Sequence, residues 1–381
     1  MKMNRHLEQH VAVFGESGSG KTVLVSSFYG ALQEPEFLSS SNYTVSADDP
    51  GQSSRLHGNY LGMKRSGRRP DATRFASDRY SFSVRLEGHS GDGPFDALRV
   101  VWHDYPGEWF DGDLSGSAEE DRRLDTFKAL LASDVAFLLV DGQRLLDNEG
   151  EEERYLKSLF GSFRTGLLAL RDDLLEDGKP LVQFPRIWIL ALSKADLLPH
   201  LDVFGFRDLV IEKAAADLVE LRRVIEGLVD SPEALAVGED FALLSSARFE
   251  PDRIEVTERL GLDLILPIAA VLPFQRHIRW VEQRQVAAKV VEDLLVGAGE
   301  MAQVLVGKVK FAGLPLFLAS RVNRDAISKA VRTAARMTGD QLRKHNAAAL
   351  AAKDHMAAVL TQFQMDLSQG EEDRVLFRSR R

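Results

Sequence analysis

A glycine-rich string directly after a short apolar run constrains the fold of this chain most strongly. It reads G-E-S-G-S-G-K-T and fits the pattern G-x-x-x-x-G-K-[ST]. Its glycines let the backbone curl so that successive N–H groups point inward at phosphate oxygens, and the following helix directs its positive end at the same anion. We expect Lys21 to reach the β- and γ-phosphates and the Thr22 hydroxyl to bind Mg²⁺. The residues predicted to contact a nucleotide here are Gly15, Glu16, Ser17, Gly18, Ser19, Gly20, Lys21 and Thr22.

Apolar, β-branched segments alternate with segments of helical period along the chain. Such alternation predicts a mostly parallel sheet covered by helices on both faces, a three-layer α/β fold. The expected strands are His10–Phe14, Tyr80–Leu86, Leu98–His103, Val135–Val140, Ile187–Leu192 and Phe241–Leu244. The expected helices are Lys21–Ala31, Ala118–Ala132, Glu151–Leu175 and Phe206–Leu228. Residues 33–79 are rich in polar residues and glycine, which predicts a long functional loop of the switch I type.

A carboxylate ends one of the predicted strands. The apolar run V-V-W-H is followed by Asp104, and Asp104 and Gly107 form the pattern D-x-x-G. A phosphate-binding loop needs an aspartate on a neighbouring strand to hold Mg²⁺ or its water. The backbone N–H of Gly107 can contact the γ-phosphate, so a loop that pivots there can sense this group.

Two further short strings follow the later strands, and each is suited to recognise a base. The first is S-K-A-D, which comprises Ser193, Lys194 and Asp196 and resembles the guanine-specific N/T-K-x-D. An aspartate can accept two hydrogen bonds from the N–H groups of guanine, whereas adenine offers no such donor pair. The usual asparagine is replaced by Ser193, whose shorter side chain gives weaker support to the phosphate loop. The second string, S-S-A, resembles an S-A-x motif and adds Ser246 and Ala247 as base contacts.

The order of these motifs resembles that of Ras-like P-loop GTPases of the translation-factor-related (TRAFAC) class. The resemblance covers about residues 8–250. It implies a six-stranded, mainly parallel sheet in which the second and third strands are antiparallel, with GTP or GDP and Mg²⁺ as ligands. The string D-Y-P-G-E-W also resembles bacterial YcjX-like P-loop NTPases. On this basis, residues 1–250 form the GTPase domain, 251–299 a linking helical segment and 300–381 a basic, Ala-rich helical tail.

The resemblance also implies two residues of the catalytic machinery. A switch I threonine would bind Mg²⁺ before the second strand, and Thr73 is preferred to Thr44 for this role. Glu108 stands where many relatives have a glutamine that orients the attacking water, and a carboxylate could accept a hydrogen bond from that water. The predicted catalytic residues are thus Lys21, Thr73, Gly107 and Glu108. Arginine-finger candidates in the polar loop are Arg65, Arg68, Arg69 and Arg74.

Charge is unevenly distributed along the chain. Residues 300–381 hold fourteen Lys and Arg against eight Asp and Glu, a net +6, whereas the whole chain carries −9. Helical segments are expected at Gln275–Leu295 and at 322–368, and the charged end E-E-D-R-V-L-F-R-S-R-R is expected to fray. The tail is interpreted as a helical cap on the acidic domain, a docking or homodimer surface, or a site for nucleic acid or an anionic membrane.

The absence of cysteine excludes disulfides, thiolate zinc sites and a cysteine nucleophile. No window reaches the roughly eighteen apolar residues of a membrane span, and the first residues do not form a signal peptide, so a cytoplasmic protein is expected. The favoured function is a GTPase switch that acts on a protein partner. The alternatives are an ATPase or broad NTPase, which Ser193 keeps open, and a binding module that does not hydrolyse its nucleotide.

Overall fold

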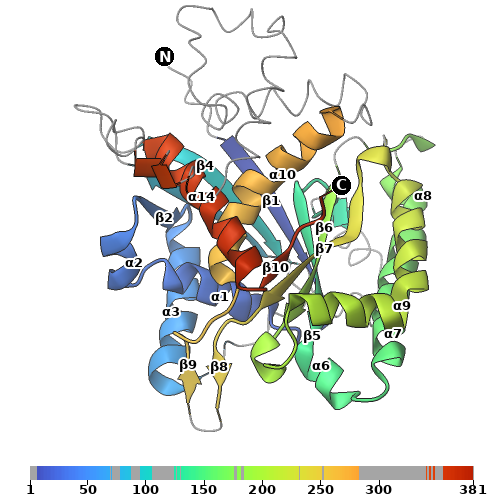
Figure 1. Ribbon diagram of the computed structural model, residues 1–381, viewed down its shortest axis with the longest axis horizontal. Helices are drawn as coiled ribbons and strands as arrows, with labels where there is room; N and C mark the ends of the chain where they lie inside the picture. The colour runs from blue at the N-terminus through green and yellow to red at the C-terminus, as the bar shows by residue number, and fades with distance from the viewer. Residues whose placement is uncertain are drawn as a thin grey trace, which may run out of the picture.

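The protein is built around an eight-stranded sheet flanked by helices in the computed structural model (Figure 1). The structure describes residues 7–68, 70, 78–86, 95–104, 124–125, 127–128, 130–175, 178–181, 184–230, 232–250, 253–282, 340, 343–344, 346–347 and 355–380. The strands are β1 (Leu7–Phe14), β2 (Tyr43–Ala47), β3 (Asp78–Leu86), β4 (Phe95–Asp104), β5 (Val135–Asp141), β6 (Ile187–Ser193), β7 (Ala236–Leu244) and β10 (Leu376–Phe377), with a separate hairpin β8 (Arg248–Phe249) and β9 (Ile254–Glu255). The helices are α1 (Lys21–Ala31), α2 (Pro35–Ser40), α3 (Pro50–Ser66), α6 (Gly142–Asp147), α7 (Glu152–Ala169), α8 (Arg171–Leu174), α9 (Val203–Glu226), α10 (Ile265–Glu282) and α14 (His355–Glu372).

The centre of the sheet is parallel and its edges are antiparallel. The strand order is β10-β7-β6-β5-β1-β4-β3-β2, and the strands from β7 to β4 run parallel. Every residue of β5 and β6 is buried, as expected for strands covered on both faces. The predicted mainly parallel sheet and the antiparallel pairing of the second and third expected strands, β3 and β4, are confirmed. The sheet has eight strands rather than six because β2 and β10 extend its two edges.

Aromatic side chains join the sheet to the helices on its two faces. On one face Trp102 of β4 packs against Phe28 of α1, with ring centroids 5.8 Å apart. On the other, Phe14 of β1 meets Phe163 of α7 edge to face at 5.1 Å. Because successive residues of a strand point to opposite faces, β1 and β4 contribute to both layers of the core.

The prediction of a long loop at residues 33–79 is wrong for most of that range. Residues 35–66 form α2, edge strand β2 and the seventeen-residue helix α3. Helix α3 begins at Pro50, where the Asp49 side chain accepts a hydrogen bond from the Gln52 N–H, and ends at Gly67 in the left-handed conformation. Only Leu56, Tyr60 and Met63 of α3 are buried. The helix packs on α1, and a Cβ at Gly30 would clash with the Tyr60 ring.

The predicted fraying of the C-terminus is also wrong. Strand β10 lies at the edge of the sheet beside β7 (Figure 1). Its Leu376 is fully buried. Helix α14 packs on α10, which begins at Ile265, earlier than the predicted Gln275. The rest of the expected helix at 322–368 lies largely outside the described residues. Within the described part of the chain, no helix is long and apolar enough to cross a membrane.

A buried ion pair joins α10 to β7, and the C-terminal segment forms a hydrogen bond with it. Arg276 of α10 donates to both carboxylate oxygens of Asp240 on β7, at 2.6 and 2.9 Å. Both side chains are at most 1% exposed, and the Ser379 N–H also donates to Asp240. A backbone hydrogen bond therefore ties Ser379, beyond β10, to the buried Asp240.

Candidate nucleotide-binding site

The predicted motifs meet at the carboxyl edge of the parallel strands. The phosphate loop follows β1, Asp104 ends β4, Ser193 ends β6, and Ser245 follows β7. The strand register places Val13 beside Asp104 and Ser193 beside Leu244. Parallel strands end at one edge of a sheet, which is where open α/β folds bind their ligands.

The phosphate loop has the backbone shape that its glycines allow. Gly18 and Gly20 have φ of 81° and 91°, a region that other residues rarely adopt. A Cβ at Gly15 would lie 2.6 Å from Ser19 Oγ, so this position has room only for glycine. Lys21 Nζ donates hydrogen bonds to the carbonyls of Gly15 at 2.7 Å and Glu16 at 3.0 Å. The buried ammonium group therefore ties the first turn of α1 back across the loop.

The donor set of this loop fits a phosphate with Mg²⁺. Ser19 Oγ is buried and has no hydrogen-bond partner among the described residues, so the loop holds an unused polar group. Thr22 and the buried Asp104 supply a hydroxyl and a carboxylate, the hard oxygen ligands that Mg²⁺ prefers. No group of three or more His, Asp or Glu side chains in the described chain could hold a metal by itself. Such a site suits Mg²⁺ that is shared between the protein and nucleotide phosphates.

The residues predicted to recognise the base come from two segments far apart in sequence. Ser245 Oγ lies 2.7 Å from Asp196 Oδ1, to which it donates, and 3.1 Å from the Ala247 carbonyl. Ser246 and Ala247 are buried, and Ala247 belongs to an apolar cluster with Tyr60, Met63, Ile254 and Val256. Helix α3 thus packs directly behind the loop that follows β7. No contact was predicted for Ser245 from the sequence, although this residue is the first of the S-S-A string.

Lys194 and Ser193 hold the S-K-A-D motif against β5. Lys194 has φ of 53°, an uncommon left-handed conformation for a residue with a side chain, and its Nζ forms a 2.8 Å ion pair with the buried Asp141. Ser193 Oγ donates to the Val140 carbonyl at 3.3 Å. A Cβ at Gly142 would lie 2.7 Å from the Ser193 carbonyl, so the turns after β5 and β6 touch. Asp141 and Gly142 were not predicted, because only the fold brings β5 beside β6.

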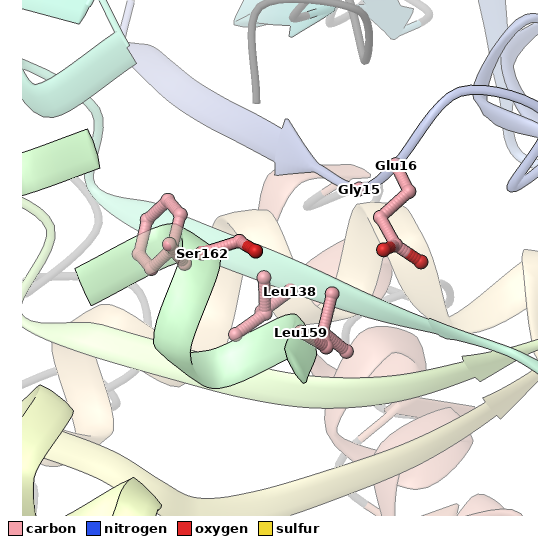
Figure 2. A pocket seen from close by; sticks show the side chains of 6 residues that line it. Gly15, Glu16, Leu138, Leu159 and Ser162 are labelled. Atoms are coloured by element: carbon pink, nitrogen blue, oxygen red, sulfur yellow. The ribbon is translucent and has the colours of Figure 1, made fainter. Parts of the chain in front are cut away.

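Glu16 is also tied to the turn after β5. Its carboxylate forms a 3.1 Å ion pair with Arg144 of α6. Glu16 is one of the residues that line a small pocket, together with Gly15, Leu138, Leu159, Ser162 and Phe163 (Figure 2). On this side of the loop, burial and then the negative charge of Glu16 raise the pKa of Tyr155. The pair of Glu16 with Arg144 is not visible in any sequence motif.

His103 is a buried strand residue, as expected from its position beside Asp104. Its Nε2 lies 3.0 Å from His10 Nδ1, and the two rings stack. Burial, followed by the nearby His10, lowers the pKa of His103 to about 4. The ring is therefore neutral at physiological pH.

Several predicted residues lie outside the described part of the chain, namely Thr73, Gly107, Glu108, Arg69 and Arg74. Thr44, the alternative to Thr73, is exposed on edge strand β2, with β3 and β4 between it and β1. Arg65 and Arg68 are exposed at the end of α3. The register pairs Asp78, the first residue of β3, with Asp104.

Comparison with solved structures finds GTP-binding proteins at low identity. The nucleolar GTP-binding protein 1 of Plasmodium falciparum has a TM-score of 0.33 and 13% identity, over 77% of this chain and 97% of that chain. The GTP-bound GTPase-like domain of Ski7 from S. cerevisiae has a TM-score of 0.29 and 14% identity, over 64% of this chain and 45% of that chain. No curated protein matches the sequence.

A family model matches a large, continuous part of the sequence. The model of the Double-GTPase 2 family aligns with residues 9–221, more than half of the 381-residue chain. The matched region runs from β1 to α9 and includes the phosphate loop, Asp104 and the S-K-A-D motif. The chain is therefore a member of the Double-GTPase 2 family and has a P-loop GTPase fold.

Proposed function

We propose that this protein binds GTP with Mg²⁺, hydrolyses it to GDP and phosphate, and uses this cycle as a switch for a protein partner. The observation that carries the proposal is the Asp196–Ser245 hydrogen bond on the same sheet edge as the phosphate loop. Such an arrangement would offer a carboxylate to the base and N–H groups to the phosphates of one nucleotide, which supports the proposal.

The phosphate half of the proposal rests on Lys21, Thr22 and Asp104. Lys21 would contact the β- and γ-phosphates, and Thr22 and Asp104 would hold Mg²⁺ directly or through water. When bound, Mg²⁺ neutralises charge on the phosphate oxygens. Thr73 precedes β3 by five residues, and β3 starts beside Asp104, which supports Thr73 as a further ligand.

The hydrolytic half of the proposal assigns Glu108 to the attacking water and Gly107 to the γ-phosphate. Both follow Asp104 closely in sequence, and Asp104 pairs with Val13 near the end of β1, which leads into the phosphate loop. The loops that contain Thr73 and Gly107 would then respond to the γ-phosphate and pass this state to the partner.

Base competition tests the binding half of the proposal. Fluorescent GDP with Mg²⁺ is displaced by unlabelled GTP, GDP, ATP or ADP, and we expect displacement by guanine nucleotides only. Asp196→Asn replaces an acceptor oxygen with a donor NH₂ group and should weaken GDP binding roughly a hundredfold. Asp208→Asn, a largely exposed position on α9, is the matched control. Equal displacement by ATP, or unchanged GDP affinity in Asp196→Asn, would reject guanine recognition in favour of a broad NTPase.

Phosphate release in a single turnover tests the hydrolytic half. The wild-type protein should release phosphate from GTP, whereas Lys21→Ala should not, and Glu108→Ala should be slower than Glu108→Gln. If the wild type binds GTP and releases no more phosphate than Lys21→Ala, the protein is a binding module without turnover.

A further inference from the structure

The phosphate loop contains a negative charge at a place where it must receive an anion. Glu16 is the second residue of the loop, and its side chain is only 9% exposed. A carboxylate this close to the phosphate cradle repels the ligand unless another charge compensates it, because a buried charge is weakly screened. The compensating cation is Arg144, 3.1 Å away on α6.

The helix that carries Arg144 is held in place on two sides. Asp141 caps α6 by accepting a hydrogen bond from the Gln143 N–H at 2.9 Å, and its other oxygen pairs with Lys194. The backbone N–H of Asp141 donates to the Tyr155 hydroxyl of α7 at 2.9 Å. The turn after β5 therefore connects the phosphate loop, α7 and the base-recognition motif.

We infer that Arg144 is a positioning residue, which neutralises Glu16 and keeps the phosphate loop able to accept a nucleotide. This inference rests on the proposed binding of a guanine nucleotide at the loop. Ser193 bonds to β5 rather than offering an asparagine side chain, and the contacts of α6 provide a different link between the two halves of the site. Without Arg144, the loop keeps the negative charge of Glu16 but loses the cation that pairs with it at 3.1 Å.

Nucleotide dissociation measures this role directly. We expect Arg144→Gln to raise the dissociation rate of fluorescent GDP three- to tenfold and that of a GTP analogue by more, because the γ-phosphate adds negative charge. Removing both charges in Glu16→Gln/Arg144→Gln should restore the rate to within about twofold of wild type. Arg144→Lys, which keeps the charge, should lie between wild type and Arg144→Gln. The increase should shrink at high salt.

The controls separate this role from general destabilisation. Lys157→Gln breaks an exposed ion pair with Glu153 on α7 and should leave the dissociation rate unchanged. Thermal unfolding without nucleotide should occur at a lower temperature in Arg144→Gln, because Glu16 is only 9% exposed, so the dissociation rates are compared well below the unfolding midpoint of either protein. An unchanged rate in Arg144→Gln, or a double variant as fast as Arg144→Gln alone, would overturn the inference. Absence of any nucleotide binding by the wild type would instead reject the proposed function.

Discussion

The two ends of the candidate site are built in different ways. The phosphate end is formed by eight consecutive residues, and its internal bonds join Lys21 to residues five and six positions away. The base end joins Asp196 to Ser245, 49 positions later, and rests on α3 and on β7, which pairs with the C-terminal β10. Local sequence thus specifies the proposed phosphate contacts, whereas the proposed base contacts depend on the whole fold. Substitutions at the phosphate end should change binding, and those behind the base end should first change stability.

The largest expected effect is at the phosphate end. Lys21→Ala removes a buried ammonium group that is proposed to contact two phosphates, and should weaken binding of GTP and GDP roughly a hundredfold or more. The free energy of unfolding should change little, because the lost hydrogen bonds are confined to the loop. Equilibrium titration and urea unfolding of the same variant measure the two quantities. A large loss of stability together with a small loss of affinity would contradict the view that the phosphate end contributes to binding rather than to stability.

The next largest expected effect is on stability, at strand β10 behind the base end. Leu376→Ala leaves a cavity where a fully buried side chain joins β10 to β7, and should lower the free energy of unfolding by about 3 kcal/mol. Affinities for GDP and GTP should fall together and by much less than in Lys21→Ala, since no phosphate contact is lost. Urea unfolding provides the measurement, and Leu168→Ala on α7, where the leucine is 47% exposed, is the matched control. Equal stability losses at Leu376 and Leu168 would show that the C-terminal strand is not part of the cooperative core.

The same contrast explains what the sequence alone could predict. The phosphate loop, the central strands and α1 are marked by local patterns, and α1 spans the expected residues. Helix α3 was missed because its buried stripe contains only Leu56, Tyr60 and Met63 within a polar segment, although their spacing is helical. Strand β10 has only two residues and no local pattern of its own, because its position is set by pairing with β7 and by the hydrogen bond from Ser379 to Asp240.

The ion pairs within the site could not be predicted from sequence patterns either. Arg144 is 128 positions from Glu16, and Lys194 is 53 positions from Asp141. An ion pair leaves no periodic signal, because either residue alone has the composition of a solvated surface. These pairs follow only from the order of β1, β5 and β6 in the sheet.

The smallest expected effect comes from a substitution at the base end that should not disturb the fold. Ser245→Ala removes the hydroxyl that donates to Asp196 Oδ1, a bond of the class that contributes about 1 kcal/mol, so GDP affinity should fall about fivefold. A less constrained carboxylate should also discriminate less well between GDP and inosine diphosphate, which lacks the exocyclic amine. Competition titrations with both nucleotides measure this ratio. Ser193→Ala removes a hydroxyl that donates to the Val140 carbonyl and not to Asp196 among the described residues, so it should leave the ratio unchanged. If Ser245→Ala also preserved the ratio, the orientation of Asp196 would have to come from the backbone of its own turn rather than from the loop after β7.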